Sequence, residues 1–437
     1  MVGQTITEKI LARAAGKGRV SPGETIEARV DVLMMHDVTS TGAIKLLREQ
    51  FENRIADGLK IVVTPDHYVP AKDIESATLY QELRQFVDEQ IEKGTDITAY
   101  MLEGGDYGVC HVMLPEKGHV IPGKVLVGGD SHTCTYGALG AFSTGIGTTE
   151  AGNVLAARSL WFRVPESVRI NVRGQMPRNV MAKDLFLRVV GDIGVDGARY
   201  QAMEWSGETI ANMGMDERMT LTNMAIEAGA KSGIIAPDGE TLNYLFNRRR
   251  NNSLFANGWR SAAEFCEGLQ SDSDAQYSKS MSVDASKLVP LVAKPHLPYN
   301  VSPASELGNV RINRAYLGSC TGGKWADFVA AADVLRGHKV AKGVQLLVVP
   351  STSDIQWRMV REGLYNIFME AGAIFSAPTC GACLGGYMGI LANGEVAISS
   401  TNRNFRGRMG HPDSLVYLAS PKTVAASAIA GHITGAQ

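Results

Sequence analysis

Hydrophobic residues in the first part of the chain form short runs that alternate with segments of helical periodicity. Residues 27–35 (EARVDVLMM) and 60–64 (KIVVT) are apolar runs of strand length, and residues 125–128 form a third run that leads into a loop of Gly, Asp, Ser and His. Residues 76–93 carry apolar positions at helical spacing. Strands that alternate with helices predict an α/β sheet whose functional groups lie at the strand ends.

The pattern changes near residue 165. Residues 167–172 (SVRINV) alternate apolar and polar positions like a new strand, and residues 182–194 have the spacing of a helix. Residues 252–303 are rich in Ser, Asp, Lys and Pro, which predicts surface structure and a linker, and a third α/β segment starts near Arg311. For a chain of 437 residues, we therefore predict an α/β protein with three domains, at residues 1–165, 166–290 and 291–437.

Composition narrows the function classes. The 43 basic and 45 acidic residues give a net charge of −2, whereas a general nucleic-acid binder carries a large basic excess. The first 20 residues mix acidic with basic side chains and lack the apolar core of a signal peptide, and no run of 18 apolar residues occurs. We therefore expect no nucleic-acid partner, no membrane insertion and a cytoplasmic location. Six cysteines are too few for a disulfide scaffold, so individual thiols are available for chemistry.

Three of these cysteines stand in Gly-rich motifs. Cys380 and Cys383 form Cys-Gly-Ala-Cys, and Cys320 lies in Leu-Gly-Ser-Cys-Thr-Gly-Gly-Lys. Three thiolates from two segments suit a 4Fe–4S cluster with one iron left open, whereas a structural zinc site normally uses four ligands. A redox pair or packed thiols are the alternatives that the spacing leaves open. Residues 318–324 also match the body of a phosphate-binding loop, but Trp325 occupies the position of the Ser or Thr that binds magnesium.

Three His/Asp pairs follow predicted strands. They are His36-Asp37, Asp66-His67 and Asp130-Ser131-His132. A carboxylate beside an imidazole orients the ring and raises its pKa, which produces a general acid. One such pair is more often a turn or a surface hydrogen bond, but three pairs at three strand ends indicate a catalytic site. His111 and His119 lie in a predicted loop on either side of Pro115 and carry little signal by themselves.

A basic loop and a glutamate complete the candidates. Residues 401–408 (TNRNFRGR) follow the apolar strand predicted at residues 396–398, and Arg binds carboxylates through a bidentate fork. Glu227 lies on a helix predicted at residues 221–230, with Asn223 one turn earlier. A solvated loop and the wet face of a helix are the simpler interpretations of these two segments.

Four of the motifs together resemble the aconitase superfamily. They are residues 129–137 (GDSHTCTYG), 318–321 (GSCT), 380–385 (CGACLG) and 401–408, and they occur in the family's order over nearly the whole chain. The resemblance implies a three-domain aconitase-like α/β fold with a 4Fe–4S cluster at the interdomain cleft. It also implies that the swivelling fourth domain is absent from this chain and is carried by a small subunit, as in a heterodimer.

The resemblance also implies roles for particular residues. Cys320, Cys380 and Cys383 match the cluster ligands, and Asp66-His67 matches the pair that protonates the departing hydroxyl. His111 matches a histidine of the same hydrogen-bonding network, and Asp130 and His132 match the acid and base near the open iron. Glu227 matches a glutamate that contacts iron-bound solvent or substrate, and Asn223 matches its neighbour. Asn402 and Arg403 match residues beside the cluster, and Arg408 matches a contact to the substrate carboxylate.

The implied activity is that of a hydro-lyase that moves a hydroxyl between adjacent carbons of a diacid. Within the superfamily, the chain is most similar to large subunits that interconvert 2-isopropylmalate and 3-isopropylmalate by dehydration and rehydration in leucine biosynthesis. Dehydratases of dimethylmalate, methylmalate or homocitrate are alternatives, as are an iron-sensing protein without catalysis and a zinc enzyme on the same thiols. Gly322, where many members have Asn, Ala382, where Pro is common, and Thr41, at a variable site, affect the expected substrate more than the reaction.

Overall fold

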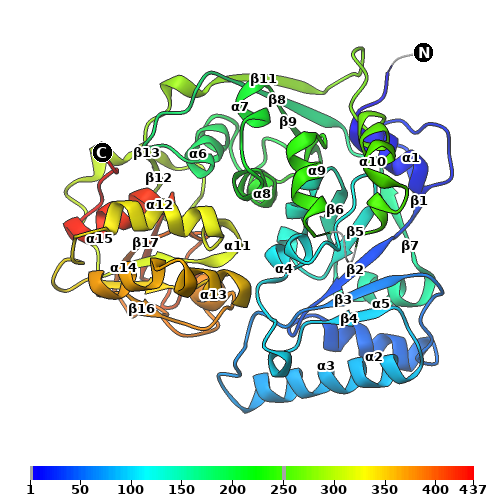
Figure 1. Cartoon of the computed structure of the whole chain (residues 1–437), viewed down its shortest axis with the longest axis horizontal. Helices are drawn as coiled ribbons and strands as arrows, with labels where there is room; N and C mark the ends of the chain where they lie inside the picture. Colours follow the sequence, from blue (N-terminus) through cyan, green and yellow to red (C-terminus); the bar gives the residue numbers. More distant parts are fainter. Residues whose placement is uncertain (1–2, 249–251) are drawn as a thin grey trace.

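Three large β-sheets follow one another along the chain in the computed structural model, which describes residues 3–248 and 252–437 (Figure 1). The first sheet has five parallel strands in the order β4-β3-β2-β5-β6. Its strands are β2 (Val32–Met35), β3 (Lys60–Val63), β4 (Ile97–Ala99), β5 (Val125–Gly128) and β6 (Phe142–Gly145). The strands predicted at residues 60–64 and 125–128 are confirmed as β3 and β5.

The single strand predicted at residues 27–35 is wrong, because the structure divides it between two sheets. Residues Thr25–Arg29 form β1, which pairs with β7 (Ser159–Arg163) in an antiparallel ribbon of two strands, whereas the next strand, β2, lies in the centre of the parallel sheet. Every second residue of β1 is exposed, but β2 is buried throughout. This contrast is typical of a half-exposed ribbon beside a central parallel strand.

Helices cover both faces of the first sheet. Alternate residues of a strand point to opposite faces, so Leu33 and Ile61 lie in one core with α1, α2, α3 and α5, while Met34 and Val62 lie in another core with α4. The helix predicted at residues 76–93 is confirmed and begins slightly earlier. The helices of this region are α1 (Ile6–Ala14), α2 (Ser40–Gln50), α3 (Ile74–Glu92), α4 (Cys110–Glu116) and α5 (Thr148–Ala157).

The second sheet has four parallel strands in the order β10-β9-β8-β11. The predicted strand at residues 167–172 and the predicted helix at 182–194 are observed as β8 and α6. The elements here are β8 (Ser167–Arg173), α6 (Ala182–Ile193), β9 (Ala202–Ser206), α7 (Glu208–Ala211), α8 (Met215–Asn223), β10 (Ser232–Ile235), α9 (Gly239–Phe246), α10 (Gly258–Glu267) and β11 (Lys279–Asp284).

Residues 252–303 are not simply surface structure and a linker. They contain α10, the edge strand β11, and two strands of the third sheet, β12 (Leu291–Ala293) and β13 (Val301–Pro303). The high Ser, Asp and Lys content of β11 matches its place at an edge, because four of its six residues are exposed. The polar composition of this segment therefore reflects an exposed edge strand and not a linker.

The third sheet has seven strands in the order β13-β12-β18-β17-β14-β15-β16, with antiparallel pairs at β12 and parallel pairs elsewhere. The strand predicted at residues 396–398 is confirmed as β17. The remaining elements are β14 (Arg314–Leu317), α11 (Ser319–Gly322), α12 (Trp325–Leu335), β15 (Gln345–Val348), α13 (Ser353–Arg361), α14 (Leu364–Ala371), β16 (Ile374–Phe375), β17 (Val396–Ser399), β18 (Leu415–Ala419) and α15 (Pro421–Ala430).

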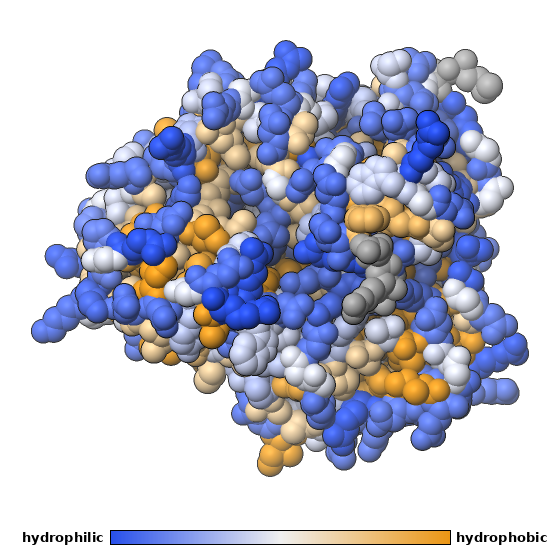
Figure 2. Space-filling view, viewed as in Figure 1, coloured by the Kyte–Doolittle hydropathy of each residue, from blue (hydrophilic) through white to orange (hydrophobic). Residues whose placement is uncertain are grey.

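The second and third sheets share one hydrophobic core. Phe186 of α6 and Trp205 of β9 lie in the same buried cluster as Tyr316 of β14 and Leu418 of β18. Sheet membership changes at the positions where the sequence predicts domain boundaries, residues 165 and 290, and we keep that division as a proposal. Within the described residues, none of the helices is both long and apolar enough to cross a membrane. Figure 2 shows a largely hydrophilic face with separate patches of hydrophobic residues. Trp357 of α13 is among the exposed large apolar residues of the chain.

Replacement of Trp205 by Ala should destabilise the protein strongly. Trp205 is 1% exposed and its ring lies 6.2 Å from that of Phe186, so its removal leaves a cavity in the shared core. Truncation of a buried Trp or Phe costs about 3–5 kcal/mol. The matched control is Trp161→Ala on β7, because Trp161 is also a strand tryptophan but is 65% exposed. Urea denaturation followed by circular dichroism measures both variants, and equal midpoints would contradict this description of the core.

Candidate active site

The three His/Asp motifs lie together at one edge of the first sheet. His36-Asp37 follows β2, Asp66-His67 follows β3, and Asp130 follows β5. These strands are parallel neighbours, so their carboxyl ends meet at the same edge. The loops are joined by side-chain contacts, and the sequence prediction that these residues form one site is therefore supported by the geometry.

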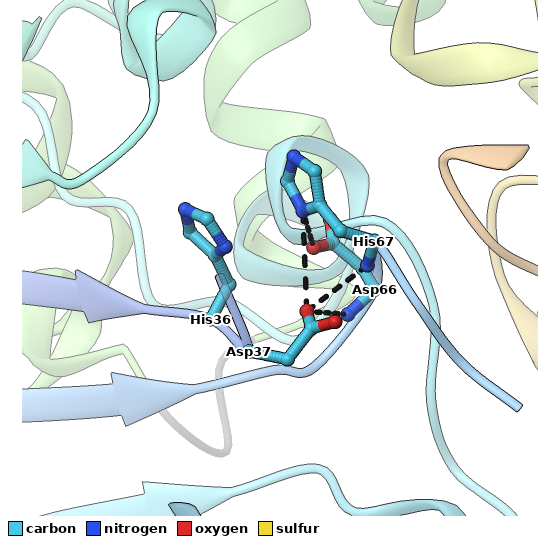
Figure 3. Close-up of side chains that lie close together, drawn as sticks. All are labelled: His36, Asp37, Asp66 and His67. Atoms are coloured by element: carbon cyan, nitrogen blue, oxygen red, sulfur yellow. Dashed lines mark hydrogen bonds and ion pairs between the residues drawn. The ribbon is translucent and has the colours of Figure 1, made fainter. Parts of the chain in front are cut away.

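His67 lies among three carboxylates. Its Nδ1 is 2.6 Å from Asp66 Oδ1 and 3.9 Å from Asp37 Oδ1 (Figure 3). Its Nε2 is 3.5 Å from Asp130 Oδ2. Burial opposes the charged imidazole, but the carboxylates, with Asp66 first, outweigh it and hold the pKa of His67 well above its usual value. A protonated, buried histidine has the state that a general acid requires.

Asp37 fixes the loop that carries His67. Its Oδ1 accepts the backbone N–H groups of Asp66 at 2.9 Å and His67 at 3.0 Å (Figure 3). Its Oδ2 accepts the backbone N–H of Tyr68 at 2.7 Å. His36 stacks on the His67 ring at 4.3 Å between centroids. Burial and the positive charge of His67 lower the pKa of His36, whereas the pKa of the stacked His67 ring is raised.

Asp130 connects two further histidines. Its Oδ1 lies 2.7 Å from His111 Nε2 and also accepts the backbone N–H of His132 at 2.7 Å. Burial opposes the charged carboxylate, but His111, His132 and His67 outweigh it and hold the pKa of Asp130 well below its usual value. His111 is on α4, so the loop predicted around it is helical over Cys110–Glu116.

The histidine His119 lies apart from this network. Its Nε2 contacts the Tyr100 hydroxyl at 2.6 Å, and burial lowers the pKa of His119 to about 3. A neutral buried histidine bonded to Tyr has a structural role, as the weak sequence signal suggested.

The elements of the second sheet and its helices, called the second region below, contribute Glu227 and Asn223 to the site. Glu227 is buried, and its Oε1 lies 2.9 Å from His132 Nε2 and accepts a bond from Arg403 Nε at 2.8 Å. The helix predicted at residues 221–230 is divided, since α8 ends at Asn223 and a 3₁₀ helix covers Met224–Ala228. The wet-face interpretation of Glu227 is therefore wrong, because this carboxylate pairs with two cationic groups inside the protein.

The three motif cysteines follow strands of the third sheet. Cys320 lies in α11 after β14, and Cys380 and Cys383 lie in the loop after β16. All three are buried, and the backbone N–H of Cys380 donates to the Asp66 carbonyl at 2.7 Å, which joins the cysteine loop to the His/Asp edge. In Figure 1, α11 lies on the side of the third sheet that faces α4 and α8.

Asn402 lies between the thiols. Its Nδ2 is 3.4 Å from Cys320 Sγ and 2.5 Å from Asn223 Oδ1, and its Oδ1 is 3.5 Å from Cys383 Sγ. A hydrogen bond from Cys380 lowers the pKa of Cys383 to about 5, and the charge of Arg408 acts in the same direction. The solvated-loop interpretation of residues 401–408 therefore fails at Asn402, which is buried against the cysteines.

The donor set fits an iron–sulfur cluster better than one metal ion. Within residues 3–248 and 252–437, the groups whose ligand atoms all lie within 4.8 Å of one another are two His/Asp clusters, and the three thiols are not among them. A zinc ion holds its sulfurs at about 2.3 Å, which requires sulfurs closer together than that. A cluster binds each cysteine through a different iron, so wider sulfur spacing is what it needs.

Arg408 supplies a cation with free bonding capacity. It is half-buried, and its Nε is buried without a hydrogen-bond partner among the described residues. An unpaired guanidinium N–H at the edge of a polar site is suited to a carboxylate ligand. Arg403, in contrast, already donates to Glu227.

Sequence reasoning missed two buried lysines around this site and gave Asp37, a member of a named His/Asp pair, no specific role. Lys183 carried no signal, and Lys324 appeared only in the rejected phosphate-loop match. Each is 1% exposed or less. A lysine within a strongly apolar helical pattern, such as Lys183, is the signal that could have drawn attention to a buried cation.

Comparisons with known proteins agree with the motif resemblance. Residues 8–309 and 297–431 match the aconitase family (aconitate hydratase). The chain is 49% identical over 432 residues to the 3-isopropylmalate dehydratase large subunit of Heliobacterium modesticaldum, covering 99% of this chain and 98% of that protein. It is 48% identical to the corresponding protein of Desulfatibacillum aliphaticivorans, covering 99% of each chain, and 48% identical to large subunit 1 of Pyrococcus furiosus, covering 99% of this chain and 98% of that protein.

A solved structure, the holo-form of aconitase X from Thermococcus kodakaraensis, aligns with a TM-score of 0.49 at 11% identity. The alignment covers 89% of this chain and 88% of that one.

Replacement of Asp66 by Asn should lower the pKa of His67. Asp66 supplies the largest of the contributions that raise this pKa, and the amide keeps an acceptor but loses the charge. Histidine-selective NMR should show the wild-type His67 ring charged through neutral pH and the variant ring losing its proton at lower pH. The control is Asp354→Asn, which removes an exposed carboxylate that pairs with Lys117. Identical His67 titrations in wild type and Asp66→Asn would contradict the assignment.

Proposed function

The chain belongs to the aconitase family, and from this premise we propose that it is the large subunit of a 3-isopropylmalate dehydratase. The observation that carries the proposal is 46–49% identity to proteins of that name over 98–99% of this chain. The chain is a hydro-lyase of leucine biosynthesis that interconverts 2-isopropylmalate and 3-isopropylmalate by removing and adding water.

Aconitase-family proteins typically bind an iron–sulfur cluster, and Cys320, Cys380 and Cys383 would hold a 4Fe–4S cluster in this chain. A bound cluster would supply Lewis-acid chemistry that stabilises negative charge on the substrate. Asn402 supports this assignment, because its amide contacts the Cys320 and Cys383 sulfurs and can donate to a thiolate or a sulfide.

His67 would donate the proton that turns the departing hydroxyl into water. Hydroxide is a poor leaving group, and a histidine that stays protonated at neutral pH supplies the proton at the moment the C–O bond breaks. Asp66 and Asp130 hold the charge on this ring, while Asp37 fixes its backbone. The reverse step, addition of water, returns the proton to His67.

The remaining site residues would orient one another and bind the polar groups of the substrate. His111 orients Asp130, and Asp130 in turn bonds the backbone of His132. Glu227 holds His132 and Arg403 in place by accepting from both. Arg408, whose Nε lacks a partner among the described residues, would bind a substrate carboxylate, with Asn402 and Arg403 beside it.

The names of the relatives imply a small-subunit partner. We propose that this partner carries the swivelling domain and the base that removes the proton from carbon, since the residues assigned here supply an acid and carboxylate contacts. The substrate would be a small diacid, and a cytoplasmic location stays a prediction.

Anaerobic reconstitution tests the cysteine assignment. Incubation of the full chain with iron and sulfide should produce a 4Fe–4S cluster, seen by EPR after reduction or oxidation. Cys380→Ala should fail to hold the same cluster, because one of three ligands is lost. The matched control is Cys266→Ala on α10, another buried free thiol outside the site. A Cys380→Ala protein with the wild-type cluster would contradict the assignment of Cys380 as a ligand. Zinc without iron in the native protein would favour a zinc enzyme.

Turnover with the small subunit tests the reaction. The reconstituted chain and its partner should interconvert the two isopropylmalates through an unsaturated diacid. The absorbance of this unsaturated diacid measures the reaction. His67→Asn should lower kcat by about 10²–10⁴, the range for loss of a general acid, with little change in KM. The control is His338→Asn, at an exposed position between α12 and β15.

The same assay separates the alternatives. Turnover of dimethylmalate, methylmalate or homocitrate in place of isopropylmalate would assign a related dehydratase, and no turnover of any diacid by a cluster-loaded complex would favour an iron-sensing protein.

A further inference from the structure

Two lysines are buried directly behind the cysteine loops. Lys183 of α6 is 1% exposed and Lys324, at the start of α12, is 0% exposed. A buried ammonium is costly unless hydrogen bonds and negative charge surround it. The groups that surround these two lysines therefore define their role.

The hydrogen bonds of both lysines go to the loops that carry the proposed cluster residues. Lys324 Nζ donates to the Thr321 carbonyl at 2.8 Å and the Cys320 carbonyl at 3.2 Å, and to Thr220 Oγ1 of α8 at 2.9 Å. Lys183 Nζ donates to the carbonyls of Ser400 and Thr401, which directly precede Asn402.

The loops bound by Lys324 and by Lys183 belong to one connected hydrogen-bond network. The Ser400 carbonyl also accepts the Thr321 hydroxyl at 2.9 Å, so the two loops are bonded to each other as well as to the lysines. Because Lys183 and Thr220 belong to the second region, the network also ties α6 and α8 to the cysteine loops.

Carboxylates also lie near the pair. Asp327 Oδ2 lies 3.0 Å from Lys324 Nζ, and Asp216 Oδ2 accepts the backbone N–H of Ala326 at 2.9 Å. Asp184 accepts the backbone N–H groups of Met181 and Leu291 at 2.8 Å each. Burial lowers the pKa of Lys183 to about 7, and the charges of Asp327 and Asp184 oppose this shift. The lysine ammonium groups therefore lie between carboxylates on one side and the loops of the proposed cluster residues on the other.

We propose that Lys183 and Lys324 are positioning residues that provide the positive charge for the anionic thiolates and the iron–sulfur cluster they hold, setting metal affinity and reduction potential. This inference rests on the proposed function, because it needs the cysteines to act as metal ligands. Backbone carbonyls of Cys320 and of the residues before Asn402 accept from the ammonium groups, which places both positive charges directly beside the proposed ligands. Reduction adds an electron to the cluster, so a nearby cation favours the reduced state.

The test uses the full chain with Lys183→Met and Lys324→Met, which remove the charge and keep an unbranched side chain. The matched control is Lys231→Met, because Lys231 is a partly buried lysine of the second region away from the cysteines. EPR-monitored redox titration of the reconstituted protein should show a more negative reduction potential than wild type for both Met variants. The control variant should keep the wild-type potential. Apo protein titrated anaerobically with Cd²⁺ should bind about tenfold more weakly in each Met variant, because three thiolates around one Cd²⁺ leave a net negative charge that a nearby ammonium stabilises.

Arginine variants separate charge from packing. Lys183→Arg and Lys324→Arg keep the charge with a larger head group, so they should stay closer to the wild-type potential than the Met variants. A wild-type chain that builds no cluster and binds no Cd²⁺ would sink the proposed function. A wild-type cluster with Met variants at the wild-type potential and affinity would overturn the lysine inference alone. Met variants that do not fold, beside folded Arg variants with unchanged potential, would support it; Arg variants as damaged as Met would overturn it.

Discussion

The buried charges at the meeting point of two sheet edges constrain the rest of the structure. A buried charge is expensive unless it is paired and hydrogen-bonded, so every element that ends here must bring a partner for another. Asp130 illustrates the requirement, since one carboxylate contacts His67, His111 and the backbone of His132. These partners come from separate strands and helices of the first sheet, while the partner of His132, Glu227, comes from the second region. The geometry of the site is therefore inseparable from the packing of the regions against one another.

Strand order explains why the groups converge. Parallel strands place their carboxyl ends at one edge, and the first and third sheets each use that edge for polar loops. The connection between them is direct: the Cys380 N–H donates to the Asp66 carbonyl, and the Thr379 hydroxyl donates to the same oxygen. Two residues of the cysteine loop are thus fixed to the loop of the proposed acid, so a displacement of either sheet would separate the acid from the thiols. The second region holds its place through the core that it shares with the third sheet.

The sequence predicts much of this arrangement because its signals are local. Short apolar runs locate β3, β5 and β17, and the residues that follow them locate most of the site. The failures are not local. Residues 27–35 read as one strand because hydrophobicity does not reveal which sheet a strand joins, and Glu227 read as a surface residue because its partners His132 and Arg403 are 95 and 176 positions away. A polar residue that is buried by partners distant in the sequence leaves no periodic pattern from which its burial could be predicted.

Gly322 shows the same point for a departure from the family pattern. The resemblance implies that Gly322 stands where many family members have Asn, so the sequence alone suggests a missing polar group beside the cysteines. In the structure, a Cβ at this position would lie 2.2 Å from Ser400 Oγ and 2.3 Å from its Cβ, so the space is already filled. The Ser400 hydroxyl also accepts the Gly318 N–H at 3.0 Å. A polar group is thus supplied from 78 positions along the chain, and the change at Gly322 is a local exchange of packing that leaves the surroundings of the cysteines polar.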